Sequence, residues 1–201
     1  MGHLNTIIVP RFNDYHVNDQ WWDYNCWLIT NVRQTVGIID NPRDQLCISR
    51  GGYRRAILHE DELYFAIKSF LPNIKRVRPD DYSVQQQKEF FANAKLIISP
   101  HRACLTNALF SNWDKLTLIE FTKQDRGGLW VSFKADLRVK QHYVIKCPSP
   151  RNCTGNEWEC DPWNTPIDLD VTNAVQIIQD ILAEKHSVDD DIFAKGNYQS
   201  N

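Results

Sequence analysis

Apolar residues along the chain fall into short continuous runs that alternate with longer stretches of helical spacing. A short apolar run predicts a strand, because a strand covered on both faces needs apolar side chains on both. The clearest run is KLIIS at 95–99, with three consecutive apolar residues at 96–98. The strands predicted in this way are residues 6–9, 46–49, 74–77, 95–99, 116–121 and 142–146.

The stretches between these runs predict helices. Residues 59–70 place acidic side chains in the first turn, where the helix dipole favours negative charge, and Pro72 follows as a stop. Ser83 followed three residues later by Gln86 is typical of a capping box at a helix start. Further helices are predicted over residues 17–35, 103–111 and 172–185, and a loop over 148–168.

The alternation of strands and helices predicts the fold class. Strands separated by helices of this length form βαβ units and a mostly parallel sheet. We therefore expect an α/β protein with a Rossmann-like, mostly parallel sheet and helices on both faces. Residues 1–185 are expected to form this single domain, and the polar, acidic residues 186–201 a flexible tail.

Charge and composition indicate which partners and which cell compartment to expect. The net charge is −2 and the basic residues form no stripe, so nucleic acid is not an expected partner. No run reaches the roughly 18 apolar residues of a membrane span, so none is expected in this chain. The N-terminus lacks the pattern of a signal peptide, which favours the cytoplasm. A longer natural chain would leave the Golgi lumen open.

Several enzyme classes are excluded by missing motifs. No GxGxxG follows a predicted strand, and GxxxxGK(S/T) and GxSxG are absent, which disfavours dinucleotide dehydrogenases, P-loop kinases and α/β-hydrolases. The chain has six cysteines but no CxxC pair, so a zinc ribbon or a thioredoxin-like site has no support. No metal site is expected.

The first candidate site follows the strand at 46–49. In parallel sheets of this kind, ligands bind beyond the carboxyl ends of the strands. The segment RGGYRR at 50–55 puts Arg50, Arg54 and Arg55 at such an end, with two glycines that permit a tight turn. Planar guanidinium groups match phosphate oxygens, so a diphosphate clamp is one interpretation. The other is a solvated basic loop that pairs with the acidic residues at 60–62.

The second candidate site follows the strand at 95–99. His101, Thr106 and Asn107 surround the predicted start of a helix, where backbone N–H groups and the helix dipole attract anions. Alternatively they are ordinary loop and helix residues. Glu120, at the end of the next strand, could accept hydrogen bonds from ribose hydroxyls, lie on the surface or pair with an arginine. Cys104 is expected to be a packing residue.

These segments together resemble glycosyltransferase family 61. That family typically has an ISR-to-RRI segment with a following Asn-Glu pair, a Val-x-Pro element and a Gln-containing helix. A strand ending in Pro-His-Gly-Ala-Gly-Leu-Thr-Asn and a Val-Ile-Glu strand complete the pattern. Here the matching segments are ISRGGYRRAILHEDEL (48–63), the stretch from IKRVRP to PHRACLTNALF (74–110), and LTLIEF (116–121). Order and spacing agree across the central third of the chain.

The resemblance implies one half of a GT-B-type glycosyltransferase, inverting and metal-independent, with no cofactor. The implied partners are a nucleotide-sugar donor, typically a UDP-sugar, a glycan or glycoprotein acceptor, and an adjoining acceptor-binding domain. The residues that match the family's donor-site positions are Arg50, Arg55, His101, Thr106, Asn107 and Glu120.

Two departures from the family pattern bear on function. Arg102 and Cys104 replace both glycines of Gly-Ala-Gly, so side chains occupy the space where a diphosphate would approach the backbone. Arg102 is interpreted as an added diphosphate ligand, with a different donor or lost activity as alternatives. His59 also replaces the usual Asn.

An inverting transfer needs a base for the acceptor hydroxyl, and the N-terminal segment supplies the candidates. Asp14 and His16 are the residues proposed, near Trp21 and Trp22, whose rings could line an acceptor site. Two other functions remain open. One is a non-catalytic nucleotide-sugar-binding or interaction domain, and the other is an enzyme with a different phosphate-bearing substrate.

Overall fold

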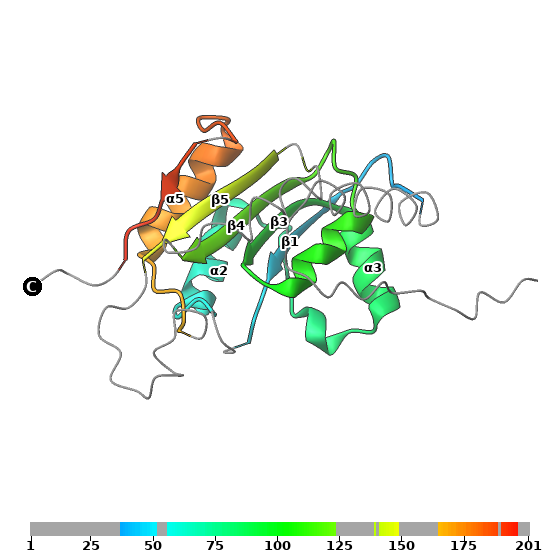
Figure 1. The fold of residues 1–201 in the computed structure, drawn as a ribbon, viewed down its shortest axis with the longest axis horizontal. Helices are drawn as coiled ribbons and strands as arrows, with labels where there is room; N and C mark the ends of the chain where they lie inside the picture. Colours follow the sequence, from blue (N-terminus) through cyan, green and yellow to red (C-terminus); the bar gives the residue numbers. More distant parts are fainter. Residues whose placement is uncertain are drawn as a thin grey trace, which may run out of the picture.

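The computed structural model describes residues 37–51, 56–123, 139, 141–148, 165–188 and 190–196. In these ranges a six-stranded sheet runs in the order β2-β1-β3-β4-β5-β6, with every neighbouring pair parallel (Figure 1). The strands are β1 (Asp44–Ile48), β2 (Lys75–Val77), β3 (Ala94–Pro100), β4 (Thr117–Lys123), β5 (Gln141–Cys147) and β6 (Ile192–Phe193). The expected α/β fold with a Rossmann-like parallel sheet is confirmed.

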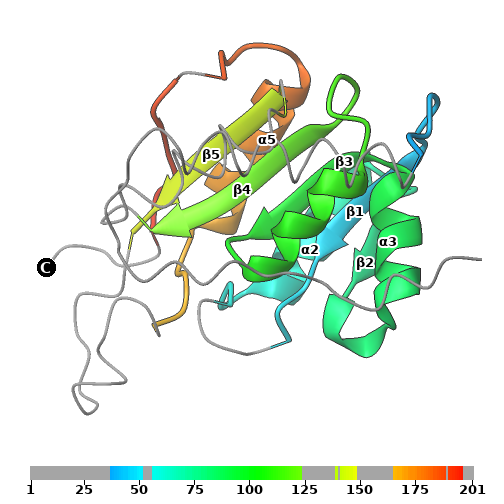
Figure 2. The ribbon, with the colours of Figure 1, turned by 45° about the vertical axis from the view of Figure 1, so that its right-hand side comes forward.

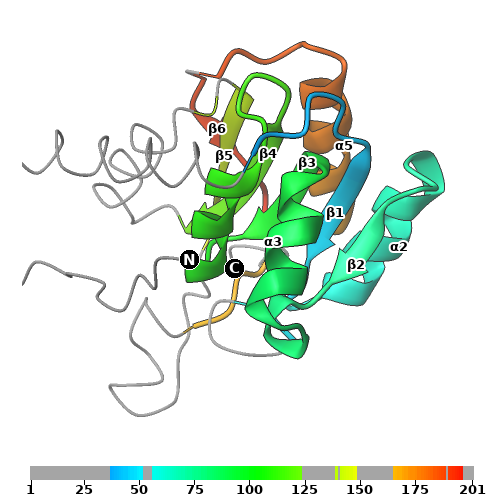
Figure 3. The ribbon, with the colours of Figure 1, turned by 90° about the vertical axis from the view of Figure 1, so that its right-hand side faces the viewer.

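Helices cover both faces of the sheet, as expected (Figure 2, Figure 3). α2 (Glu60–Phe70) and α5 (Val171–Leu182) contact each other on one face. α3 (Val84–Ala92) and the 3₁₀ helix η2 (Ala103–Phe110) lie together on the other, and the short 3₁₀ helix η1 (Pro79–Asp81) precedes α3. None of the helices in these ranges is long and apolar enough to cross a membrane.

Each face of the sheet has its own core, because successive side chains of a strand point to opposite faces. Ile98 and Phe121 pack with Ile67 on the face covered by α2 and α5. Ile97 packs with Phe91 and Leu105 on the face covered by α3 and η2. The continuous apolar run of β3 is therefore explained by burial on both sides.

Most predicted elements are found within one or two residues of their expected ends. The capping box of α3 is complete: Ser83 accepts from the backbone N–H of Gln86, and the Gln86 side chain accepts from the Ser83 backbone. The helix expected after β3 is present but is 3₁₀ rather than α. The predicted strand at 6–9 and helix at 17–35 lie outside the described residues.

The expectation of a flexible tail from residue 186 is wrong for the segment around β6. Ile192 and Phe193 pair with Ile145 and Lys146 of β5. Ile192 and Ala194 are buried against the core under α5, and Ala194 N–H donates to the Lys146 carbonyl at 2.9 Å. A strand of two residues leaves too short an apolar run for the sequence pattern to register.

The strand order places a switch in topology between β1 and β3. The chain leaves β1 for β2 on one side and then crosses to β3 on the other. In open α/β sheets, the crevice at the carboxyl ends of such a strand pair is the usual ligand site. Arg50 lies beyond the end of β1, and His101 and Arg102 follow β3. The sheet therefore brings the two predicted segments to one edge.

Candidate functional site

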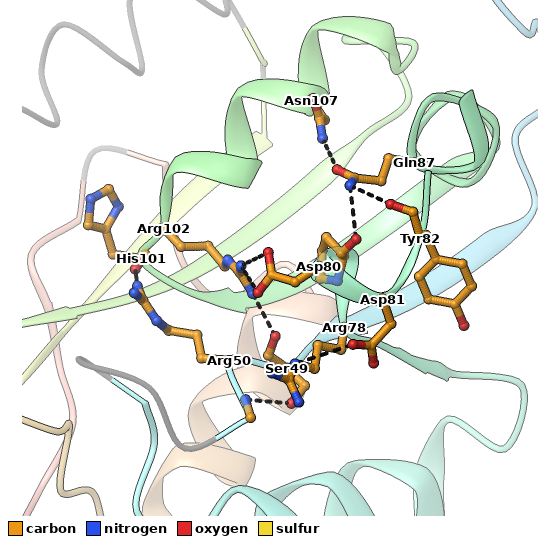
Figure 4. Close-up of polar contacts among 12 residues, drawn as sticks. Ser49, Arg50, Arg78, Asp80, Asp81, Tyr82, Gln87, His101, Arg102 and Asn107 are labelled. Carbon is orange, nitrogen blue, oxygen red and sulfur yellow. Dashed lines mark hydrogen bonds and ion pairs between the residues drawn. The ribbon is translucent and has the colours of Figure 1, made fainter. Parts of the chain in front are cut away.

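Arg50 and His101 are in direct contact at the switch point. Nη1 of Arg50 donates to the carbonyl oxygen of His101 at 2.5 Å, so the side chain after β1 ties down the loop after β3 (Figure 4). The backbone N–H of His101 in turn donates to the carbonyl of Phe121 on β4 at 2.8 Å. The arginine and histidine segments thus meet on neighbouring strands, as the sequence predicted.

Between Arg50 and the acidic start of α2, the described contact is a hydrogen bond from the Arg50 backbone. The N–H of Arg50 donates to Oε2 of Glu60 at 3.3 Å, while the guanidinium reaches toward His101. Glu60 has its ion pair with Arg76 instead, at 2.7 Å. The Arg50 side chain therefore reaches from the end of β1 to the loop after β3.

Arg102 reaches in the other direction, from the loop after β3 to the end of β1. Its Nη1 donates to the Ser49 carbonyl at 2.7 Å, and its Nη2 contacts both carboxylate oxygens of Asp80 at 2.9 Å (Figure 4). The Arg102 side chain is 11% exposed and that of Asp80 is 50% exposed. At the position where the family motif has its first glycine, this chain therefore has a largely buried guanidinium, and that guanidinium already has a carboxylate partner.

A third arginine, Arg78, follows β2 and lies over Gly51. Gly51 has φ of +60°, and a Cβ there would be 2.8 Å from the guanidinium of Arg78. Nε of Arg78 lies 3.7 Å from a carboxylate oxygen of Asp81. Sequence reasoning missed Arg78, although its place beside Pro79 at a strand end was a signal. Three adjacent strands, β2, β1 and β3, are thus each followed by an arginine.

Glu120 is held between two histidines beneath this edge. Oε1 of Glu120 lies 2.9 Å from Nδ1 of His101, and Oε2 lies 2.9 Å from Nε2 of His142. In the register of β4 and β5, His142 is opposite Leu118, so the pleat puts it on the same face as Glu120. The carboxylate is fully buried. Both oxygens already have imidazole partners, so the ribose contact expected of Glu120 is not the contact it makes here.

The two histidines keep the buried carboxylate ionised. Burial on its own would raise the pKa of Glu120, but its hydrogen bonds with His101 and His142, together with positive charge on imidazole, outweigh burial and hold the pKa below its ordinary value. An ionised carboxylate only accepts hydrogen bonds, so His101 donates from Nδ1 and His142 from Nε2. His142 carried no functional prediction, since one histidine within a strand gives no local motif.

A family model for glycosyltransferase 61 matches residues 3–118, which is more than half of the chain. The chain belongs to the glycosyltransferase 61 family. The matched part includes Arg50, Arg78, His101 and Arg102, and it ends within β4, before Glu120. A search of curated proteins finds no match to the chain.

Asn107, in the loop that matches the family motif, is directed toward α3 (Figure 4). Asn107 donates from Nδ2 to Oε1 of Gln87 at 2.9 Å and so ties η2 to α3 (Figure 4). Nε2 of Gln87 donates to the carbonyls of Pro79 and Tyr82 at 2.9 and 3.1 Å, which fixes the start of α3 against η1. Thr106 is exposed.

Cys104, at the second glycine position of the family motif, is a packing residue. Burial raises the pKa of its thiol to about 11, so it is protonated at neutral pH and unsuited to nucleophilic attack. Among the described residues, no group of three or more His, Cys, Asp or Glu side chains is placed to hold a metal ion. Asp14, His16 and Arg55 lie outside the described residues.

Proposed function

We infer that this chain is the donor-binding half of a GT-B-type glycosyltransferase that takes its sugar from a nucleotide diphosphate, preferably UDP. The observation that carries this proposal is the meeting of Arg50 and His101 across the β1–β3 switch point. A diphosphate has charged oxygens on both phosphates, and this edge offers a guanidinium from one strand and an imidazole from its neighbour.

The distribution of charge supports placing the diphosphate beside His101. On the α2 side of Gly51 lies a hollow of about 510 Å³ whose lining includes three consecutive carboxylates, at residues 60–62, and one arginine, Arg76, which is already ion-paired with Glu60 and Asp61. Carboxylates repel phosphate oxygens, whereas Arg50, Arg78 and Arg102 attract them. We therefore place the diphosphate on the arginine side of the sheet edge, with Arg55, Thr106 and Asn107 as the further ligands that the family resemblance implies.

The chemistry proposed is transfer with inversion, without a metal ion. The acceptor oxygen attacks the anomeric carbon, a base takes the hydroxyl proton, and the bond from that carbon to the diphosphate oxygen breaks. The diphosphate leaves with the electron pair, and the cationic groups at Arg50 and His101 stabilise the negative charge that develops. Asp14 and His16 remain the proposed base candidates. The acceptor proposed is a glycan or glycoprotein, seated against an adjoining domain.

A thermal-shift panel of UDP-, GDP-, TDP- and CMP-sugars tests donor binding. A ligand that binds only the folded chain raises its Tm in proportion to the logarithm of its concentration, so a UDP-sugar should raise Tm more than the other three. If no nucleotide sugar in the panel raises Tm, the donor-binding proposal is wrong. Release of free sugar from the stabilising donor then separates a transferase from a binder.

The second candidate is a non-catalytic nucleotide-sugar-binding domain. The observation that favours it is the guanidinium of Arg102, which with Asp80 occupies space that glycine leaves open in the family motif. A domain of this kind would show the thermal shift with UDP-sugars but neither hydrolyse the donor nor transfer its sugar.

A further inference from the structure

His101, Glu120 and His142 form a hydrogen-bonded group of three side chains. Binding of a phosphate by His101 alone would not require the other two. The group joins the loop after β3 to β4 and β5 through two hydrogen bonds of 2.9 Å. The side chains of Glu120 and His142 are 0% and 1% exposed, and that of His101 is 20% exposed. A buried carboxylate is strongly disfavoured unless a positive charge and hydrogen bonds accompany it. The two imidazoles bonded to Glu120 are the groups best placed to carry that positive charge.

The difference in burial decides which imidazole is charged. Desolvation disfavours the imidazolium form, and it acts more strongly on the enclosed ring of His142 than on the partly exposed ring of His101. The Nε2–H of His142 completes the second hydrogen bond to Glu120. His101 is the cation, bonded to the carboxylate through Nδ1, and its Nε2–H lies across the ring from Glu120.

Other charged groups around His101 do not reverse this assignment. Arg50, from the end of β1, disfavours a second positive charge nearby, since its guanidinium contacts the His101 carbonyl. Arg102 is offset by Asp80 of η1, and the Cys104 thiol is neutral. Within the described part of the chain, Glu120 of β4 is the anion that bonds directly to the ring.

We propose that Glu120 is a positioning residue, kept ionised by His142, that holds His101 as an imidazolium with its Nε2–H directed to the diphosphate. The proposal rests on the proposed function for its ligand. His101 then supplies a full positive charge where the neutral tautomer, with hydrogen on Nδ1, would present only a lone pair. Glu120 acts on the leaving group through His101 and touches no substrate itself.

Proton and nitrogen NMR of the full chain tests the charge assignment without any ligand. His101 and His142 are assigned by single substitution to Asn, and their ring nitrogens are followed against pH. We expect His101 to stay an imidazolium to a higher pH than a free histidine, and His142 to be neutral with hydrogen on Nε2. If His101 is neutral at pH values where free histidine is charged, or if His142 is the cation, the proposal fails.

Glu120→Gln tests the link to binding, with Glu184→Gln at an exposed position of the same chain as control. The amide oxygen of the substituted side chain can still accept from Nδ1 of His101 but no longer favours the cation. We expect the variant to bind UDP about tenfold more weakly than the wild type at about pH 8 and within about twofold of it at about pH 5.5. Both proteins bind the same UDP, so the change in UDP protonation between the two pH values affects both affinities and cancels in their ratio. An equal ratio at both pH values would mean a merely structural role.

Two variants of His142 provide a second test, which can still be made if Glu120→Gln does not fold. His142→Gln keeps a donor to Glu120 and should retain the wild-type pH profile of UDP binding, whereas His142→Leu should weaken binding at high pH. The same profile for both variants would contradict the role given to His142. If the wild-type chain binds no UDP at any pH, the proposed function fails, and the NMR result still decides the state of His101.

Discussion

Arg102 and Asp80 form an ion pair at the place where a glycine is typical of the family, with Nη2 of the arginine 2.9 Å from each carboxylate oxygen. In the proposed function a phosphate oxygen binds this guanidinium, and the Asp80 carboxylate would then compete with it. Because the Asp80 side chain is 50% exposed, it can turn toward solvent when a stronger anion arrives. The pair therefore gives the diphosphate a competitor within the chain.

Replacing Asp80 by Asn should tighten the binding of UDP several-fold, because the neutral amide competes less well for Arg102. Isothermal titration calorimetry at low salt measures the change. Asp44→Asn is the matched control, since Asp44 also loses an ion pair, with Lys75 at 2.6 Å, but at the opposite end of β1. Weaker binding by Asp80→Asn alone would show that the pair organises the site instead of competing for it.

Arg50→Ala should remove the increase in Tm that a UDP-sugar produces. A charge-assisted hydrogen bond contributes about 1.5–3 kcal/mol, so the affinity should fall by about tenfold to about a hundredfold. The loop after β3 would also lose the bond to the His101 carbonyl. Arg43→Ala serves as control, because Arg43 is exposed and precedes β1 at its amino end. An unchanged thermal shift in Arg50→Ala would remove Arg50 from the site.

The pH dependence of stability should contain a contribution from Glu120. Its pKa in the folded chain is below the ordinary value, so the stabilisation is present above the unfolded-state pKa and is lost as the pH falls through the folded-state pKa. Urea unfolding of the wild type should therefore show stability falling in the acid range. Glu120→Gln should start less stable at neutral pH, and the gap between the two proteins should shrink in acid. A constant gap would contradict this linkage.

Ser83→Ala should lower the free energy of unfolding by about 1 kcal/mol, because it removes one half of the capping box of α3. Ser69→Ala is the comparison. The Ser69 hydroxyl donates to the Ala66 carbonyl at 2.7 Å within an exposed helical turn, where alanine is the better helix former. Urea midpoints should fall for Ser83→Ala and stay equal or rise for Ser69→Ala.

The capping box illustrates which features a sequence can predict. Ser83, Gln86 and the apolar run of β3 act on residues close to them in the chain, so local spacing was sufficient to find them. The same holds for the placement of Arg50 and His101 at strand ends, which the parallel sheet then brought together. Local chemistry and the topology rule together predicted the edge of the sheet at which the candidate site lies.

The partners of Glu120 and Arg102 could not be predicted in this way. Glu120 bonds to His142, 22 residues away, through a register that depends on how β4 pairs with β5. Arg102 bonds to Asp80 of η1, and η1 is tied to α3 by the hydrogen bond from Gln87 to the Pro79 carbonyl. Neither contact leaves a periodic pattern, because each depends on tertiary structure. The short strand β6 was missed for the same reason.

Comparing Gly51→Ala with Gly37→Ala separates two effects: the strain of a side chain at positive φ, which both variants share, and the displacement of Arg78, which occurs in Gly51→Ala alone. Both glycines have positive φ, +60° and +73°, so each substitution should cost about 1 kcal/mol in stability. At Gly37 a Cβ meets nothing within 4 Å, whereas at Gly51 it meets the Arg78 guanidinium at 2.8 Å. That guanidinium is the mobile end of a long side chain and can move aside. The two variants should therefore have similar urea midpoints, but only Gly51→Ala should weaken UDP binding. Equal affinity in both would show that Arg78 takes no part in holding the diphosphate.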